Sequence, residues 1–210
     1  MADETRGAWR CRLKSTAKHS KPDGIRDRIL RTALHLFTER GYFNTSVHDI
    51  QRDAAVSIGS IYNHFGGKEG VAKALYIELV EYMNTFVAQA ANLHNDTYGR
   101  CRAVVAGLFQ LTEDDPEMIG FVLNARHREF LPDEPPICSS EPFVQMREFV
   151  LQGMQTGEVR QMDPMIAASV AYGAALRMIS LRLDGIVSTP LPELTDSVWE
   201  ASWQAIAADA

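Results

Sequence analysis

Apolar residues recur at helical spacing through most of the chain. The first such face carries Ile25, Ile29, Leu30, Ala33, Leu36 and Phe37, and Gly41 follows it as a stop signal. Two short stretches come next, at 46–53 and 57–64, and a long one runs from Lys68 to about Leu93. Further helices are predicted at 100–112, 116–130, 141–156, 164–183 and 191–208. No stretch alternates as a β-strand does, so the sequence predicts an all-α fold.

Composition narrows the class of protein. The 210 residues are 46% hydrophobic and 23% charged, which is typical of a globular chain with a sizeable core. The longest stretches without a charged residue, 82–95 and 164–176, fall short of the roughly 18–20 residues that a membrane span needs. The basic N-terminus has no apolar segment behind it, and three widely spaced cysteines do not form a disulfide framework. We therefore expect a cytoplasmic protein without a membrane partner.

Charge is distributed unevenly along the chain. Residues 1–75 hold 13 Lys and Arg against 8 Asp and Glu, whereas the remainder is strongly acidic within a total net charge of −6. This asymmetry suggests one half that binds phosphate and another that avoids nucleic acid. Residues 1–22 are basic and show no apolar periodicity. They are predicted to be a flexible arm, either a solvated tail or a segment that contacts phosphates or the minor groove.

The two short helices at 46–53 and 57–64 have the properties of a helix-turn-helix. Ala54-Ala55 forms a small turn between them, and the faces that would pack together are apolar: Val47, Ile50, Ala54, Val56 and Ile61. The second helix is short, and its N-terminal end is made mostly of small or polar residues that allow it to enter a major groove: Ser57, Ile58, Gly59 and Ser60.

At these residues the sequence resembles the tetracycline-repressor (TetR) family of bacterial transcription regulators. The resemblance covers about 23–75 and is carried by Ile29-Leu30, Ala33, Leu36-Phe37, Gly41-Tyr42, Thr45-Ser46-Val47, Asp49-Ile50, Ala54-Ala55-Val56-Ser57, Gly59-Ser60-Ile61-Tyr62, His64-Phe65 and Lys68-Glu69. The family usually has glycine where this chain has Ala55, and alanine in a left-handed cap costs about 1 kcal/mol. The turn is therefore expected to differ slightly from that of the family.

The resemblance implies a set of DNA-contacting residues. His48, Ile58, Gly59, Ser60 and Tyr62 would lie nearest the base edges, while Thr45, Ser46, Tyr62, His64 and Lys68 would hold phosphates, with Ser57 capping the recognition helix. It also implies three segments: an arm at 1–22, a three-helix DNA-binding domain at 23–75, and a helical effector-binding and dimerisation domain at 76–210. The expected function is that of a repressor released from double-stranded operator DNA by a small molecule.

A homodimer is implied through the helices at 164–183 and 191–208. The first is rich in small residues, and the second has an apolar face formed by Leu191, Leu194, Val198, Trp199 and Ile206. The alternative is that both helices only close the core of a monomer. In a dimer, an effector that favours the wrong spacing of the two recognition helices would lower the affinity for DNA.

The effector candidates lie in the methionine-rich and aromatic C-terminal half: Phe109, Phe121, Arg126, His127, Met146, Phe149 and Tyr172. An apolar pocket beside Arg126 and His127 would suit an apolar or anionic molecule. The alternatives are an ordinary core, a salt bridge for the two cations, or a protein-interaction domain in place of a sensor. Cys138 is interpreted as an inert thiol or as a redox sensor.

No catalytic residue, metal or cofactor is expected. The histidines and cysteines lack metal-ligand spacing, and the sequence contains neither a P-loop nor a dinucleotide fingerprint. Residues 55–59 differ at one position from a nucleophile elbow, but no strand precedes them as such an elbow requires.

Overall fold

The computed structural model describes residues 24–124, 127–134 and 139–208, so the predicted arm at 1–22 lies outside the described residues. The elements in these ranges are α2 (Ile25–Arg40), α3 (Val47–Asp53), α4 (Ile58–Phe65), α5 (Lys68–Ala91), α6 (Thr97–Asp114), α7 (Pro116–Asn124), α8 (His127–Phe130), α9 (Glu141–Thr156), α10 (Pro164–Leu183), η2 (Leu191–Leu194) and α11 (Thr195–Gln204). Within these ranges the β-structure amounts to one isolated bridge, between Val159 and Ala207. The predicted all-α fold is confirmed.

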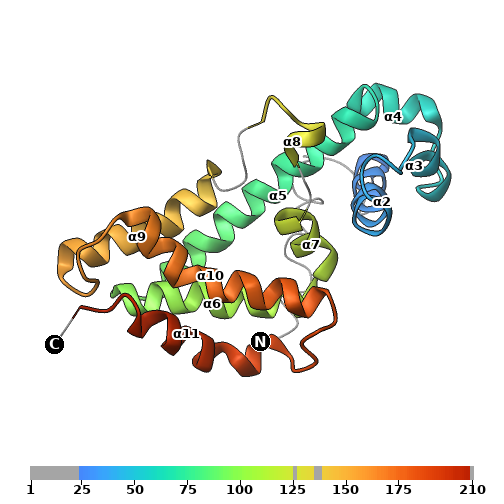
Figure 1. Ribbon diagram of the computed structural model, residues 1–210. Helices are drawn as coiled ribbons and strands as arrows, with labels where there is room; N and C mark the ends of the chain where they lie inside the picture. Colours follow the sequence, from blue (N-terminus) through green and yellow to red (C-terminus); the bar gives the residue numbers. More distant parts are fainter. Residues whose placement is uncertain (1–23, 125–126, 135–138, 209–210) are drawn as a thin grey trace. The chain divides into compact units, whose positions relative to one another are not determined.

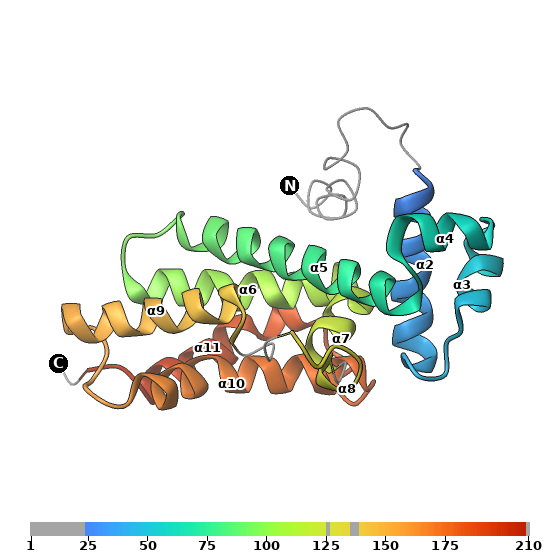
Figure 2. The same cartoon turned by 90° about the horizontal axis from the view of Figure 1, so that it is seen from above.

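The first compact unit comprises Met1–Tyr82 and Glu117–Ile137. Its described part holds α2, α3, α4, the part of α5 up to Tyr82, α7 except for its first residue, and α8. Figure 2 shows α3 and α4 side by side next to α2, with which both make contact. The core of this unit contains completely buried residues from α2, α3, α4, α5 and α7: Ile29, Leu30, Ile50, Ile61, Leu75 and Ile119. Residues of α7 thus pack with helices that precede them by about eighty positions.

The second unit comprises Met83–Pro116 and Cys138–Ala210. Here α6 packs against α9, α10, η2 and α11, and α10 also contacts α9 and α11 (Figure 1). Phe109 of α6 and Trp199 of α11 are completely buried, and Tyr172 of α10 is nearly so. Burying such large side chains contributes about 1.5–3 kcal/mol each, which makes this helix packing the main source of the unit's stability.

The C-terminal helix is shorter than predicted. In place of one helix over 191–208, a 3-10 turn η2 precedes α11, and α11 ends at Gln204. Residues beyond it turn back onto the segment after α9, where the Arg160 N–H donates to the Ile206 carbonyl (3.0 Å) and the Ala208 N–H donates to the Glu158 carbonyl (3.0 Å). These tertiary hydrogen bonds replace helical ones, so hydrophobic periodicity alone could not locate the end of the helix.

The predicted helix over 116–130 appears as two helices, α7 and α8, and the residues between them, 125–126, lie outside the described part. Helix α6 begins three residues before its predicted start because the Asp96 carboxylate caps it, accepting the Gly99 N–H at 2.6 Å. Helices α2, α9 and α10 have the predicted bounds.

Helix α10 has an unusually apolar surface. Among the described residues it is the one helix long and apolar enough, by length and composition, to cross a membrane, yet only 28% of that stretch is buried in the structure. The stretch of α10 without a charged residue ends at Leu176, because Arg177 and Arg182 follow. Arg182 forms a bidentate ion pair with Glu113 of α6, at 2.9 and 2.8 Å, which lowers the pKa of that carboxyl.

Candidate nucleic-acid interface

The α3–turn–α4 segment folds as a compact helix-turn-helix. Ile50 of α3 and Ile61 of α4 are completely buried, and Ala54 and Val56 of the turn are nearly so. Ala55 has φ = +52°, and no other non-glycine residue in the described ranges has a positive φ. Alanine therefore occupies the left-handed position at some energetic cost, and the turn keeps this conformation despite the missing glycine.

Helix α3 begins with a complete capping box. The Ser46 hydroxyl accepts the Asp49 N–H (3.1 Å), and the Asp49 carboxylate accepts the Ser46 N–H (2.9 Å). The hydroxyl and the N–H of Ser46, followed by Arg52, hold the pKa of the Asp49 carboxyl at about 2. Ser46 was expected to contact phosphate; in the structure its hydroxyl is engaged in this cap.

Helix α4 is capped by Ser57 without the reciprocal half of a capping box. The Ser57 hydroxyl accepts the Ser60 N–H at 3.1 Å and lies 2.8 Å from the Ser60 hydroxyl. Gly66 ends the helix in the left-handed conformation, and its N–H donates to the Tyr62 carbonyl at 2.8 Å. This helix of 8 residues therefore has defined ends on both sides. It is short enough to lie within a major groove.

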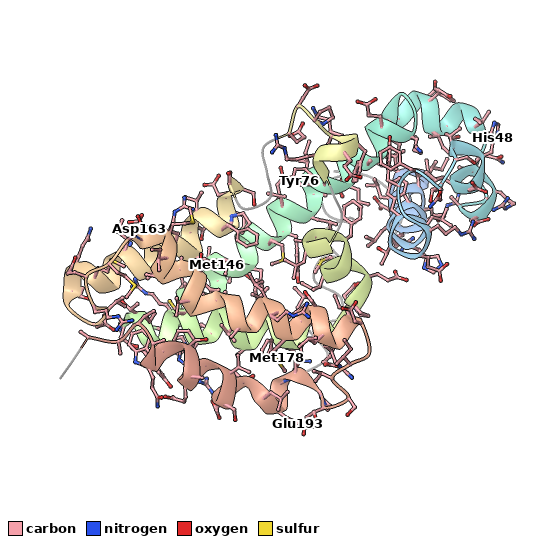
Figure 3. All side chains as sticks on the ribbon, viewed as in Figure 1. His48, Tyr76, Met146, Asp163, Met178 and Glu193 are labelled. Carbon is pink, nitrogen blue, oxygen red and sulfur yellow. The ribbon has the colours of Figure 1, made fainter. Side chains whose placement is uncertain are left out.

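Most of the residues predicted to contact DNA are exposed around α3 and α4. Tyr62 is 54% exposed and Ile58 36% exposed, and the other exposed members of the set are Ser46, His48, Ser57, Gly59 and His64. Ser60 is half-buried. His48 lies at the outer edge of α3 (Figure 3). These residues lie at the surface and leave the apolar contact between α3 and α4 intact.

Two residues of the predicted phosphate-contacting set make hydrogen bonds within the protein. Thr45 is 1% exposed, and its hydroxyl donates to the carbonyls of Gly41 (3.0 Å) and Leu36 (3.3 Å). Its side chain therefore fastens the loop between α2 and α3 instead of pointing to solvent. The Lys68 ammonium donates to the Tyr42 carbonyl at 3.0 Å and lies 4.0 Å from the centroid of the Tyr42 ring. Burial lowers the pKa of Lys68.

The comparisons with known proteins bear on this same segment. Residues 29–75 match the family described as bacterial regulatory proteins, tetR family. The chain is 38% identical to the HTH-type transcriptional regulator HbdR of Aromatoleum sp. (strain CIB) over 61 residues, which is 29% of this chain and 25% of that protein. Residues 29–75 of this chain are therefore similar to the matching segment of TetR-family regulators.

Solved structures extend the likeness to the whole fold. The fatty acid degradation regulator FadR of Bacillus halodurans has a TM-score of 0.75 at 20% identity, over 88% of this chain and 97% of that one. FadR of Bacillus subtilis, solved in complex with stearoyl-CoA, has a TM-score of 0.72 at 20% identity, over 85% and 98%. The curated relatives match over a quarter to about half of their length. The TetR-family match is therefore strongest in the helix-turn-helix, and beyond it the fold is shared.

The effector candidates fall into different parts of this TetR-family fold. Phe109, Met146 and Tyr172 are buried in the second unit, Met146 on α9 as Figure 3 shows, and Phe149 of the same helix is half-buried. Phe121 belongs to the first unit and stacks on Phe37 at a centroid distance of 6.3 Å. Arg126 and the side chain of His127 lie outside the described residues, as does Cys138.

In the second unit the buried side chains of Tyr172 and Cys101 lie next to each other, which the pattern of apolar residues does not predict. The Tyr172 hydroxyl has no oxygen or nitrogen partner among the described atoms and lies beside the Cys101 thiol. Burial raises the pKa of Cys101 to about 12, so the thiol is un-ionised and unreactive. Within the described ranges no group of His, Cys, Asp and Glu could hold a metal ion.

Sequence reasoning did not identify three residues that support the interface. Tyr42 holds Lys68, Asp49 completes the cap of α3, and the Gln51 amide donates to the Val56 carbonyl at 3.0 Å across the turn. The Ser46-x-x-Asp49 spacing is a recognisable capping signal. The other two contacts depend on tertiary geometry and leave no local signature.

Proposed function

We propose that this protein is a transcription regulator that binds operator DNA through α4 and is released by a small-molecule effector. The observation that carries the proposal is the recognition helix itself. Ile58, Gly59 and Tyr62 face solvent while Ile61 anchors the same helix in the core. A helix presented in this way can read base edges without losing its packing.

The charge around this helix supports the proposal. Residues 1–75 carry an excess of Lys and Arg over Asp and Glu, although the whole chain is acidic. The capped starts of α3 and α4 also offer backbone N–H groups and the positive ends of two helix dipoles. Phosphate groups are the ligands that such an arrangement attracts. Repression, the usual role in this family, requires only that the bound protein blocks access to the promoter.

The first test is binding to duplex DNA from the region upstream of the protein's own gene, measured across a salt series. Tyr62→Ala should weaken binding at least about tenfold, because it removes an exposed aromatic group that contacts base or backbone. Leu93→Ala is the matched control, since Leu93 is 80% exposed but lies in the turn after α5, outside the helix-turn-helix. The control should bind as the wild type does. Equal binding by Tyr62→Ala and wild type would count against α4 as the reading helix.

We further propose that the functional form is a homodimer, with α10 at its centre. A two-fold dimer places two recognition helices about 34–36 Å apart, the spacing of successive major grooves. The support is the solvent-facing side of α10, where Ile166 is 59% exposed and Met165 56% exposed. The apolar residues of the last segment contribute less than the sequence indicated, because Leu191, Trp199 and Ile206 are buried within their own unit.

For the effector we propose a molecule with a long apolar chain and an anionic group, of the acyl-CoA class. Support comes from the apolar interior of the second unit, which contains Phe109, Met146 and the Tyr172 hydroxyl, and from the shared fold of the Bacillus subtilis protein solved with stearoyl-CoA. Binding to the conformer with the wrong recognition-helix spacing would weaken DNA affinity by a coupling energy of typically 1–3 kcal/mol.

Stearoyl-CoA is the probe for this part of the proposal, with CoA alone as the control. At a hundredfold excess over its Kd, stearoyl-CoA should raise the free energy of unfolding by about 2.7 kcal/mol, seen as a higher melting temperature. It should also release bound duplex in a fluorescence anisotropy titration. No thermal shift with stearoyl-CoA, or an equal shift with CoA alone, would contradict the role of the acyl chain.

A further inference from the structure

The ammonium group of Lys68 is held in one place before any DNA is present. It donates to the Tyr42 carbonyl at 3.0 Å and lies 4.0 Å from the centre of the Tyr42 ring. An ammonium group has three N–H donors, so the hydrogen bond to the Tyr42 carbonyl leaves N–H groups that can donate to a phosphate oxygen. A lysine restrained in this way loses less side-chain freedom on binding than a lysine on a free surface does.

The Tyr42 ring is in turn fixed by aromatic neighbours. Phe130 of α8 stacks on it with centroids 4.3 Å apart and planes inclined by 15°. Phe37 of α2 and Phe43 touch it at centroid distances of 5.3 Å each, at tilted and edge-on angles. Phe130 makes the closest and most nearly parallel of these contacts and is itself only 8% exposed.

The segment that carries Phe130 is tied to α5 at a second point. Leu131 is buried, and the Glu134 carboxylate forms an ion pair with Lys73 at 2.7 Å. Both lysines lie near the start of α5, and all of these residues belong to the first compact unit. A displacement of the segment 130–134 would therefore alter the surroundings of Lys68 and Lys73 together.

We infer that Phe130 is a positioning residue for the DNA contact of Lys68: by stacking on Tyr42, it holds the lysine where it meets a backbone phosphate. The inference rests on the proposed function, because it assigns to α8 an influence on DNA affinity that is exerted through Lys68. Phe130 does not itself touch DNA. It acts through the Phe130–Tyr42–Lys68 stack, and a change at α8 would be felt as the loss of one phosphate contact in each protomer.

The DNA arm of the test compares five variants with the wild type on the duplex defined above. Phe130→Leu keeps an apolar side chain but removes the ring. It should weaken DNA binding about 3- to 10-fold, and the slope of log binding constant against log salt concentration should fall by about 1 per protomer. Lys68→Ala should do the same, and the double variant should bind no more weakly than Lys68→Ala alone. Phe130→Tyr restores a stacking ring and should restore binding. Leu93→Ala, the exposed control used above, lies outside this aromatic cluster and should keep the wild-type slope.

A second arm needs no DNA. Lys68 Nζ lies over the Tyr42 ring, 4.0 Å from its centroid. The NMR signals of the neighbouring Cε protons are therefore expected to be shifted upfield in the wild type and in Phe130→Tyr, and to return toward ordinary lysine values in Phe130→Leu. Circular dichroism confirms that each variant is folded.

The outcomes separate this inference from the proposed function. If the wild type binds no duplex, the proposed function fails, and the NMR arm still decides whether Phe130 positions Lys68. If the wild type binds and the effects of Phe130→Leu and Lys68→Ala simply add, or if the upfield shift survives in Phe130→Leu, the positioning role is overturned.

Discussion

Gly70→Ala should strongly destabilise the first compact unit, even though alanine favours helices more than glycine does. Gly70 lies in the first turn of α5, and a Cβ atom there would come 1.7 Å from the carbonyl oxygen of Phe65 and 2.8 Å from its carbonyl carbon. Both atoms belong to the backbone of α4, so no side chain can rotate to relieve the contact. The start of α5 and the end of α4 would have to move apart, at an expected cost above about 3 kcal/mol.

Thermal unfolding followed by circular dichroism measures this effect. A loss above about 3 kcal/mol corresponds to a lowering of the melting temperature of this unit by more than about 10 °C. Gly59→Ala is the matched control in the same unit, because its Cβ would only reach ordinary contact with the Ser57 hydroxyl at 3.8 Å. That variant should be as stable as the wild type or slightly more stable. A Gly70→Ala protein that melts within about 3 °C of the wild type would contradict the close approach of α4 and α5.

Gly173→Glu should convert the proposed dimer into a folded monomer. Gly173 lies on α10 opposite the buried stripe formed by Ala167, Ala171 and Ala175, and a Cβ there would meet no atom within 4 Å. The protomer therefore has room for the new side chain. A partner helix packed closely against a glycine would not, and two symmetry-related glutamates would bring like charges together in an apolar contact.

Sedimentation equilibrium, paired with the DNA titration, gives the readout. The variant should sediment as a monomer with unchanged helical content and should bind the duplex at least about a hundredfold more weakly, because it loses the second recognition helix. Val144→Glu introduces the same charge at a 40% exposed apolar position of α9 and should remain dimeric. A Gly173→Glu protein that is still dimeric would place the interface elsewhere on the molecule.

Prediction from the sequence was most accurate where local chemistry sets the structure. The bounds of α2, α9 and α10 follow from apolar periodicity and from end signals such as Gly41 and Pro164, and these signals act on neighbouring residues. The two short helices of the helix-turn-helix were located for the same reason, with Ser46 and Ser57 as their caps. Ala55 adopts a left-handed conformation, which usually requires glycine. It does so because Ala54 and Val56 on either side are buried and their packing determines the turn.

Prediction was least accurate where distant residues meet. The Thr45 hydroxyl looked available for phosphate in the sequence, but the fold brings it against the carbonyls of Leu36 and Gly41. Phe121 was grouped with the other aromatic residues of the C-terminal half, whereas the structure stacks it on Phe37 of α2. The last helix ended early because residues 158–160 offered its final residues backbone hydrogen bonds.

By itself, the sequence determined the all-α class, the position of α4 and the side chains that this helix exposes, because helical periodicity and capping depend on residues within a few positions of one another. The tertiary structure alone decided that Phe130 stacks on Tyr42 and Tyr42 holds Lys68, and that α10 keeps an apolar face uncovered. These contacts join residues up to eighty-eight positions apart. Their partners are selected by packing in three dimensions, which no local pattern encodes.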